Sequence, residues 1–246
     1  MTLNGRRVLV TGGGSGLGAD IACTFAAAGA DVVIAGRRLE ALQAVAKSNS
    51  NIRAVTADVT SEDSVKAMFA AAGPCDIIIA NAGTAESAPF GRTSLTQWND
   101  IIAVNLTGTF LTLREGLNQL PGWGRLIAIA SIAGLKGYPY VVPYVAAKHG
   151  VVGLVRSLAL EVARRPITVN ALCPGYLNTE MTDRSIANIV QKTGRTIAEA
   201  RAALTALSPQ GRLIEPAEVT AAALWLCGTG SESVNGQAVA ISGGEP

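Results

Sequence analysis

A tyrosine and a lysine four residues apart, Tyr144 and Lys148, form the pair best suited to proton transfer in this sequence. On a helix, this spacing places both side chains on one face, about one turn apart. The positive charge of Lys148 favours the phenolate, so we expect it to lower the pKa of Tyr144 and allow proton transfer near neutral pH. Ser131 follows an apolar run and is expected to bring a hydroxyl to the same place. For the pair alone, the alternative is an ordinary surface contact on a helix.

A glycine-rich segment near the N-terminus has the context of a phosphate-binding loop. The sequence T-G-G-G-S-G-L-G, at 11–18, follows a strand-like run at 7–11 and precedes an alanine-rich helical pattern. Gly12, Gly16 and Gly18 would let the backbone approach a pyrophosphate, and the helix N-terminus would offer it free N–H groups. Because the spacing G-x-x-x-G-x-G departs from G-x-G-x-x-G, the alternative is a plain turn.

The residues after the second predicted strand favour a phosphorylated dinucleotide. That strand spans 31–36 and ends at Gly36, where folds that prefer NAD carry an acid for the ribose 2′-OH. Arg37 and Arg38 follow, so no carboxylate repels a phosphate and a guanidinium is available to pair with one. We therefore predict that NADP(H) is favoured over NAD(H), which stays possible, and that Arg37 reads the phosphate. The alternative is that both arginines are solvated at a helix start.

Strand-like and helix-like segments alternate along the whole chain. This alternation predicts a single α/β domain over 1–246, with one doubly wound parallel sheet. Ligands of such sheets bind at the carboxyl ends of the strands, where Asp58-Val59 and Asn81-Ala82-Gly83 follow two of them. The predicted strands are 7–11, 31–36, 52–57, 76–80, 124–131, 167–172 and 237–242.

Three polar features lie near these strand ends. Asp58 is expected either to accept a hydrogen bond from an adenine amino group or simply to shape its turn. Asn105, inside a long helical pattern at 94–119, is expected to fill a hydrogen-bonding need at a kink or to hold a water. The polar helical segment 179–208 follows the sixth strand, and we interpret it as a substrate lid, with plain surface helices as the alternative.

Composition and charge exclude several function classes. The chain has 246 residues, and its net charge of +2 provides no basic stripe for nucleic acid or an anionic membrane. No apolar run approaches the roughly 20 residues of a membrane span, and the N-terminus lacks a signal-peptide pattern. The four cysteines are isolated and His149 is the one histidine, so neither a metal site nor a disulfide is expected. We therefore expect a soluble, cytoplasmic protein that binds no metal, nucleic acid or membrane.

Together and in this order, these residues resemble the short-chain dehydrogenase/reductase family in its one-domain form, over essentially the whole chain. The resemblance implies a Rossmann-type sheet of about seven parallel strands with helices on both faces. It also implies an NAD(P)-dependent oxidoreductase that forms a homotetramer. The motifs that carry it are T-G-G-G-S-G-L-G at 11–18, Asp58-Val59, Asn81-Ala82-Gly83, Asn105, Ser131, Y-V-A-A-K at 144–148 and P-G-Y-L-N-T at 174–179.

The same resemblance implies a role for each candidate site residue. Tyr144 would be the general acid/base and Ser131 would hold the substrate oxygen. Lys148 would bind the nicotinamide ribose and lower the pKa of the tyrosine, and Asn105 would anchor a water in a proton relay. His149 would lie on another face of the helix, in packing or an interface. The implied cofactor-binding residues are Gly12, Ser15, Gly16, Leu17, Gly18, Arg37, Asp58, Val59, Asn81, Ala82, Gly83, Tyr144, Lys148, Pro174, Gly175, Leu177 and Thr179.

The expected reaction is the NADP(H)-dependent interconversion of a ketone and a secondary alcohol. The lid and C-terminal sequences resemble members that act on 3-oxoacyl thioesters, which makes a CoA or carrier-protein thioester the leading substrate. Arg184, Lys192 and Arg195 would meet its phosphates, or else form a solvated helix face. The rival expectation is an NAD-dependent dehydrogenase of a hydroxyacyl-CoA or other secondary alcohol. A non-catalytic nucleotide-binding scaffold or redox sensor is the rival from another class, and the complete set of four catalytic candidates argues against it.

Overall fold

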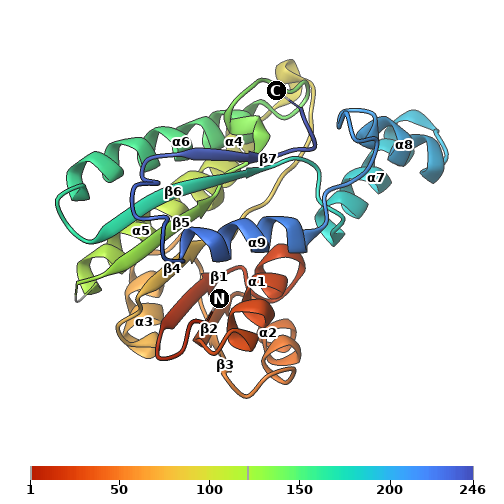
Figure 1. Cartoon of the computed structure of the whole chain (residues 1–246). Helices are drawn as coiled ribbons and strands as arrows, with labels where there is room; N and C mark the ends of the chain where they lie inside the picture. The colour runs from red at the N-terminus through yellow and green to blue at the C-terminus, as the bar shows by residue number, and fades with distance from the viewer. Residues whose placement is uncertain (1, 121, 246) are drawn as a thin grey trace.

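The strands of the protein form one parallel sheet. They are β1 (Arg7–Thr11), β2 (Asp31–Gly36), β3 (Ile52–Thr56), β4 (Ile77–Ala80), β5 (Gly124–Ile129), β6 (Ile167–Pro174) and β7 (Ala238–Ile241). In the computed structural model, which describes residues 2–120 and 122–245, their order is β3-β2-β1-β4-β5-β6-β7 (Figure 1). Every neighbouring pair is parallel. The predicted doubly wound α/β sheet is confirmed, and its strand order reverses between β1 and β4.

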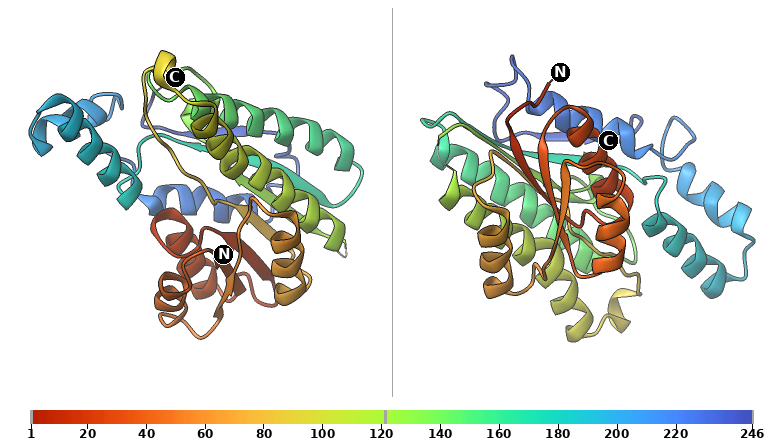
Figure 2. Two further views of the ribbon diagram at one scale, coloured as in Figure 1. Left: turned by 180° about the vertical axis from the view of Figure 1, so that it is seen from behind. Right: turned by 90° about the horizontal axis from the view of Figure 1, so that it is seen from below.

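Helices cover both faces of the sheet (Figure 2). They are α1 (Gly16–Ala27), α2 (Leu39–Ala46), α3 (Glu62–Ala72), α4 (Leu95–Ile102), α5 (Gly108–Gln119), α6 (Val142–Val162), α7 (Glu180–Thr193), α8 (Ile197–Thr205) and α9 (Pro216–Leu226). One apolar cluster joins the sheet to α1, α2 and α9, and a second joins the other face to α3, α5 and α6. Helices α7 and α8 stand out from the body beyond the end of β6 (Figure 1).

Strand β4 shows why the sheet needs helices on both sides. It is fully buried, and its side chains alternate between the two apolar clusters. Ile77 and Ile79 face α1 and α9, whereas Ile78 and Ala80 face α3 and α5. A strand that is apolar on both faces is stable only as an inner strand of a covered parallel sheet. This burial fixes the carboxyl end of β4 beside that of β1.

The long helical pattern at 94–119 is not one α-helix. It is α4, then a π-helical segment at Ala103–Thr107, then α5, and the interruption therefore precedes Gly108. A π segment adds a residue to the turn and re-aims the side chains around it. Here the π segment contains Asn105, the residue that the sequence analysis expected either at a kink or holding a water.

The predicted lid segment contains two helices, α7 and α8. Between them, Gly194 adopts a left-handed conformation with φ of 71°, which ends α7 at low steric cost. Thr196 and Glu199 then form a reciprocal capping box that starts α8.

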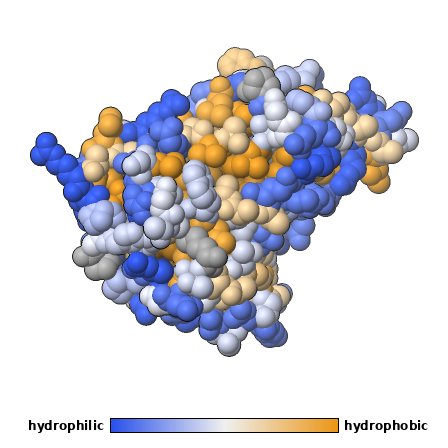
Figure 3. All heavy atoms as spheres, viewed as in Figure 1, coloured by the Kyte–Doolittle hydropathy of each residue, from blue (hydrophilic) through white to orange (hydrophobic). Residues whose placement is uncertain are grey.

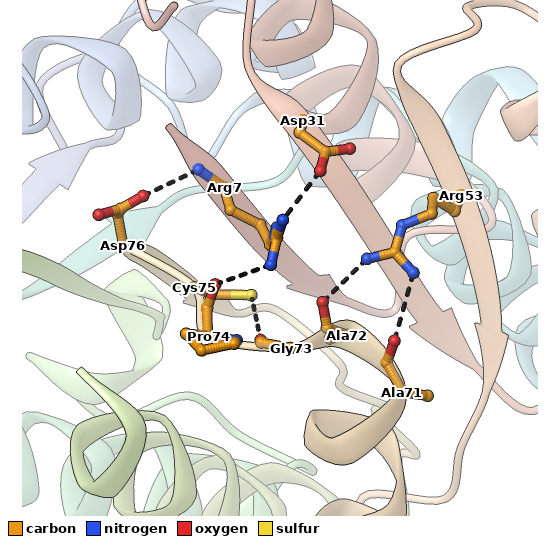
Figure 4. A network of polar contacts seen from close by, with 9 residues as sticks. All are labelled: Arg7, Asp31, Arg53, Ala71, Ala72, Gly73, Pro74, Cys75 and Asp76. Carbon is orange, nitrogen blue, oxygen red and sulfur yellow. Dashed lines mark hydrogen bonds and ion pairs between the residues drawn. The ribbon is translucent and has the colours of Figure 1, made fainter. Parts of the chain in front are cut away.

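At the amino ends of the strands, arginine side chains bind the neighbouring segments (Figure 4). Arg53 on β3 donates to the carbonyl oxygens of Ala71 and Ala72, at 3.2 and 2.8 Å, and so satisfies the C-terminus of α3. Arg7 on β1 pairs with Asp31 at 3.3 Å. These contacts lie at the amino ends of the strands and leave the other edge available for ligands.

The surface carries apolar side chains at the β7 edge. Figure 3 shows them gathered over β7 and α9. Trp225 on α9 is 50% exposed and Leu160 on α6 is 80% exposed. In the ranges that the structure describes, no helix has the length and apolar character to cross a membrane.

Candidate active site

A cleft of about 570 Å³ lies at the carboxyl ends of the strands. Its walls come from the glycine loop, the ends of β4, β5 and β6, the start of α6 and the start of α7. It therefore lies where open parallel sheets bind ligands. Every predicted site residue lines it, namely Gly12, Ser15, Gly16, Leu17, Gly18, Arg37, Asp58, Val59, Asn81, Ala82, Gly83, Asn105, Ser131, Tyr144, Lys148, Pro174, Gly175, Leu177 and Thr179.

The glycine loop has the backbone of a phosphate cradle. Gly12 and Gly16 have φ of 68° and 51°, in the left-handed region that glycine adopts freely. At Gly18, a Cβ atom would lie only 2.3 Å from the oxygen of Gly12 and 2.5 Å from Nδ2 of Asn81. The loop leads into the N-terminus of α1, whose N–H groups and dipole favour an anion. These features fit the pyrophosphate of a dinucleotide.

Asn81 joins this loop to β4. Its side-chain Nδ2 donates to the oxygen of Thr11 at 2.8 Å, and Thr11 Oγ1 accepts from the backbone N–H groups of Asn81 and Ala82 at 3.0 and 3.1 Å. The two strands at the reversal of the sheet are thus held together at the centre of the cleft.

Arg38 contacts the glycine loop. Its Nη2 donates to Ser15 Oγ at 3.4 Å, and both residues line the cleft with Arg37. Asp58 shapes its turn, because Oδ1 accepts from the N–H and hydroxyl of Thr60 at 2.9 and 2.8 Å. These bonds, and more weakly the charge of Arg37, lower the pKa of Asp58.

The three groups proposed for proton transfer meet at the near end of the cleft. Ser131 follows β5, whereas Tyr144 and Lys148 share one face of α6. Lys148 is 3% exposed, its Nζ donates to the oxygen of Ile129 at 2.7 Å, and it lies 5.5 Å from the centroid of the Tyr144 ring. Ser131 Oγ accepts from the N–H of Ala133 at 3.1 Å, which fixes the hydroxyl at the end of its strand. The predicted spacing on one helix face is confirmed.

Burial sets the proton affinities of the pair. It raises the pKa of Tyr144 to about 12, although the Ser131 hydroxyl partly offsets this, and it lowers the pKa of Lys148 to about 8. The net shift of the Tyr144 pKa is thus upward, opposite to the fall that the sequence analysis expected, and burial of the phenol is its largest cause. At neutral pH, Tyr144 is a protonated phenol.

Asn105 ties the π segment to the loop after β4. Its Nδ2 donates to the oxygens of Thr84 and Ile101 at 2.8 and 2.9 Å, and its Oδ1 accepts from the N–H of Thr84 at 3.3 Å. The residue is fully buried. Of the two expectations for Asn105, the hydrogen-bonding need at a kink is the one seen.

We expect Asn105→Ala to lower the free energy of unfolding by about 2 to 3 kcal/mol, because it removes three hydrogen bonds from a fully buried side chain to the backbone of Thr84 and Ile101. Differential scanning calorimetry would then show Tm lower by roughly 5 to 10 °C. The matched control is Asn99→Ala on the exposed side of α4, which should change stability by no more than about 0.5 kcal/mol. Equal stability of the two variants would contradict a structural role for the Asn105 amide.

The start of helix α7 lines the cleft, and the helix is held to the loop that follows β4. Asn188 Nδ2 donates to Ser87 Oγ at 2.7 Å, and Lys192 Nζ donates to the oxygen of Ser87 at 2.8 Å. Of the three basic residues singled out in this segment, Arg184 lines the cleft and Lys192 binds the loop. The trio therefore does not form a common basic patch.

The family model described as short chain dehydrogenase matches residues 6–189 of the chain. The chain belongs to the short-chain dehydrogenase/reductase family. As a member it is an NAD(P)-dependent oxidoreductase, and the nicotinamide cofactor matches the cradle and the cleft described above.

Similar members of the family include several reductases. A putative ketoacyl reductase of Streptomyces coelicolor is 35% identical, over 96% of this chain and 95% of its own length. A 3-oxoacyl-acyl-carrier-protein reductase of Aquifex aeolicus is 35% identical over 98% of both chains. Among solved structures, a variant actinorhodin polyketide ketoreductase with NADPH has a TM-score of 0.94 and 34% identity, and the match covers 97% of this chain and 96% of that one.

The sequence analysis missed the aromatic wall of the substrate half of this dehydrogenase cleft. Tyr138 and Tyr176 both line it and pack edge to face, with ring centroids 6.4 Å apart. Tyr176 lies inside the P-G-Y-L-N-T motif, so the motif could have identified it as a residue that lines the cleft. Tyr138 lies in an irregular loop, where no periodicity marks it. Arg38 was weighed only together with Arg37 and was given no position of its own.

Proposed function

We propose that the protein reduces a ketone to a secondary alcohol, with NADPH as reductant and a 3-oxoacyl thioester as substrate. One observation supports this proposal above the others. A single cleft is lined by Ser131, Tyr144 and Lys148 at one end and by the glycine cradle at the other. A nicotinamide cofactor bound between these ends would supply the hydride. The names of the ketoacyl and 3-oxoacyl reductases that the chain resembles support this substrate class.

In this proposal, the chain's own residues act on the carbonyl oxygen. The hydroxyls of Ser131 and Tyr144 donate hydrogen bonds to it and stabilise the negative charge that develops there. With its pKa raised to about 12, the phenol of Tyr144 is protonated at neutral pH, which is the protonation state that a proton donor for reduction needs. Lys148, fixed by the oxygen of Ile129, would hold the cofactor ribose. Asn105, which lines the cleft, would anchor a water in the proposed proton relay.

The direct test measures the loss of near-ultraviolet absorbance of NADPH and NADH with the purified protein. The panel contains acetoacetyl-CoA, an acetoacetyl carrier protein and simple cyclic and linear ketones. We expect turnover with the thioesters, and faster turnover with NADPH than with NADH. If no ketone of the panel is reduced with either cofactor, the proposed function is wrong.

The NADP preference leads to a prediction about both arginines. Replacing Arg38 with Asp should weaken NADPH binding about 10- to 100-fold, the loss of one charge-assisted contact, and should weaken NADH binding far less. Arg37→Asp should have a smaller selective effect, because Arg38 is the arginine in contact with Ser15 of the glycine loop. Calorimetric titration with each reduced cofactor measures both affinities.

A matched control for this prediction is Lys47→Asp, which makes the same charge change on an exposed residue just after α2. It should leave the ratio of NADPH to NADH affinity within about twofold of the original value. Equal weakening of both cofactors by Arg38→Asp would mean that Arg38 reads no phosphate.

A second candidate function is the oxidation of a hydroxyacid or other secondary alcohol with NAD. The relatives named D-beta-hydroxybutyrate dehydrogenase, 34% identical in Rhizobium meliloti, favour it. One experiment distinguishes the two candidate functions. The second function requires NAD⁺-dependent oxidation of hydroxybutyrate and tighter binding of NADH than of NADPH.

We also infer roles for the surrounding segments. Residues 179–208 would act as the substrate lid, and Arg184 is its basic residue best placed to meet a thioester phosphate, since it lines the cleft. The family resemblance supports a homotetramer, and the sequence features described above favour a cytoplasmic location. The exposed Trp225 on α9 is suited to a subunit interface.

A further inference from the structure

The C-terminal residues fold back against the substrate half of the cleft. After β7 the chain turns through Gly243 and Gly244, with φ of 66° and 95°, in a region that disfavours other residues. Ser242 Oγ then donates to the backbone oxygen of Glu245 at 2.8 Å and closes the turn. Glu245 is only 6% exposed.

Two side chains of one loop hold the buried carboxylate of Glu245. Lys136 Nζ lies 2.9 Å from its Oε1, and the Tyr138 hydroxyl donates to the same oxygen. A buried carboxylate costs free energy unless it is paired and hydrogen-bonded. Because both partners come from the loop between β5 and α6, the carboxylate fixes the position of that loop.

Tyr138 carries this restraint into the cleft. Its ring lines the cleft and packs edge to face on Tyr176, while its hydroxyl is engaged by Glu245. The ring is thus held through its hydroxyl and through its contact with Tyr176, and it lines the same cleft as Tyr144. The same loop is tied a second time, since Ala88 N–H donates to the oxygen of Tyr140 at 2.8 Å.

We propose that Glu245 is a positioning residue for the substrate, which acts by fixing the Tyr138 ring as a rigid wall of the cleft. The wall limits how a ketone can lie against Ser131 and Tyr144, and therefore sets substrate affinity and the face of the ketone that is reduced. This role rests on the proposed ketoreductase function. Glu245 itself touches neither the reacting atoms nor the cofactor in this scheme.

The test compares three variants of the full chain with acetoacetyl-CoA as substrate. Glu245→Ala should raise KM about tenfold with kcat within about threefold, and should lower the enantiomeric excess of the hydroxyacyl product. Tyr138→Phe, which keeps the ring but loses its anchor, should act in the same direction. Glu245→Gln, whose amide oxygen still accepts from Tyr138, should stay within about threefold of the original KM. The double variant Tyr138→Phe with Glu245→Ala should have a KM no higher than that of either single variant, since both changes remove the same hydrogen bond.

A second readout does not depend on turnover. Trypsin cuts after Lys136, so release of the loop should speed cleavage there at least fivefold in Glu245→Ala, with little change in Glu245→Gln. Asp31→Asn, which removes an ion pair at the opposite edge of the sheet, is the control and should change neither cleavage nor KM (Figure 4).

The outcomes separate the two proposals. If the unmodified protein reduces no ketone, the proposed function fails, and the restraint of the loop is judged by proteolysis alone. If the protein is active, unchanged KM and enantiomeric excess in Glu245→Ala overturn the positioning role. An equal fall in kcat and Tm in all variants, with KM unchanged, would also overturn it, because that pattern is what a purely structural contact gives. If Glu245→Ala does not fold, the KM values of Tyr138→Phe and Glu245→Gln decide. A raised KM in Tyr138→Phe alone supports the positioning role, and equal KM values overturn it.

Discussion

Replacing Tyr144 with Phe is expected to lower kcat about a thousandfold and to leave cofactor affinity within about threefold of the original. The change removes one hydroxyl and keeps the ring on α6, so the walls of the cleft are preserved. What is lost is the proton donor and one of the two hydrogen bonds proposed for the carbonyl oxygen. The measurement is steady-state reduction of acetoacetyl-CoA together with calorimetric titration of NADPH.

The matched control for this variant is Tyr140→Phe. Tyr140 lies near the same site but is 63% exposed, so removal of its hydroxyl should leave kcat within about twofold. A Tyr144→Phe enzyme with more than about a tenth of the original kcat would contradict the acid role of the phenol.

Lys148→Met should have two effects of opposite sign. Turnover should fall about a hundredfold, because a positively charged donor is lost from the centre of the site. Stability should rise, because burial lowers the pKa of this lysine from 10.5 to about 8 and the charged ammonium therefore destabilises the folded chain at pH 7. The gain is on the order of 2 kcal/mol, or roughly 5 °C in Tm, after allowance for the lost hydrogen bond to Ile129.

The stability effect of Lys148→Met has a defined pH dependence. Below pH 8 the lysine is charged in both the folded and unfolded chains, so the full cost of burial is present. Between about 8 and 10.5 the folded chain releases the proton while the unfolded chain keeps it, so the stability of the original protein rises relative to the variant. Thermal unfolding of both proteins from pH 7 to 10 should therefore show a shrinking difference in Tm. The control is Lys66→Met on the surface of α3, whose effect should be near zero at each pH. A Lys148→Met protein less stable than the original at pH 7 would contradict the cost assigned to burial.

The cofactor half of the cleft was predictable because its signals are local. The glycine loop, its strand and its helix are contiguous, and the backbone conformations of Gly12 and Gly16 are ones that glycine alone adopts easily. Tyr144 and Lys148 were predictable for a similar reason, since helix geometry converts their spacing into a shared face. The fully apolar run of β4 likewise indicated an inner parallel strand.

What the sequence left undetermined depends on contacts between distant segments. The pairing of Tyr138 with Glu245 joins residues 107 positions apart. The sign of the pKa shift of Tyr144 depends on how deeply the phenol is buried, which spacing does not reveal. Likewise, the side chain of Asn105, in the π segment, is bonded to Thr84 on a separate loop.

The aromatic wall of the cleft has a practical consequence for engineering. The cofactor cradle and the proton-transfer groups are mounted on β1, β5 and α6, whose inner faces form the buried core. Tyr138 and the residues of α7 that line the cleft belong instead to a loop and to a helix that stands apart from that core (Figure 1). Libraries confined to 135–141 and 180–194 would therefore vary the acceptor range and enantiopreference while the cofactor cradle, the proton-transfer groups and the buried core are inherited unchanged.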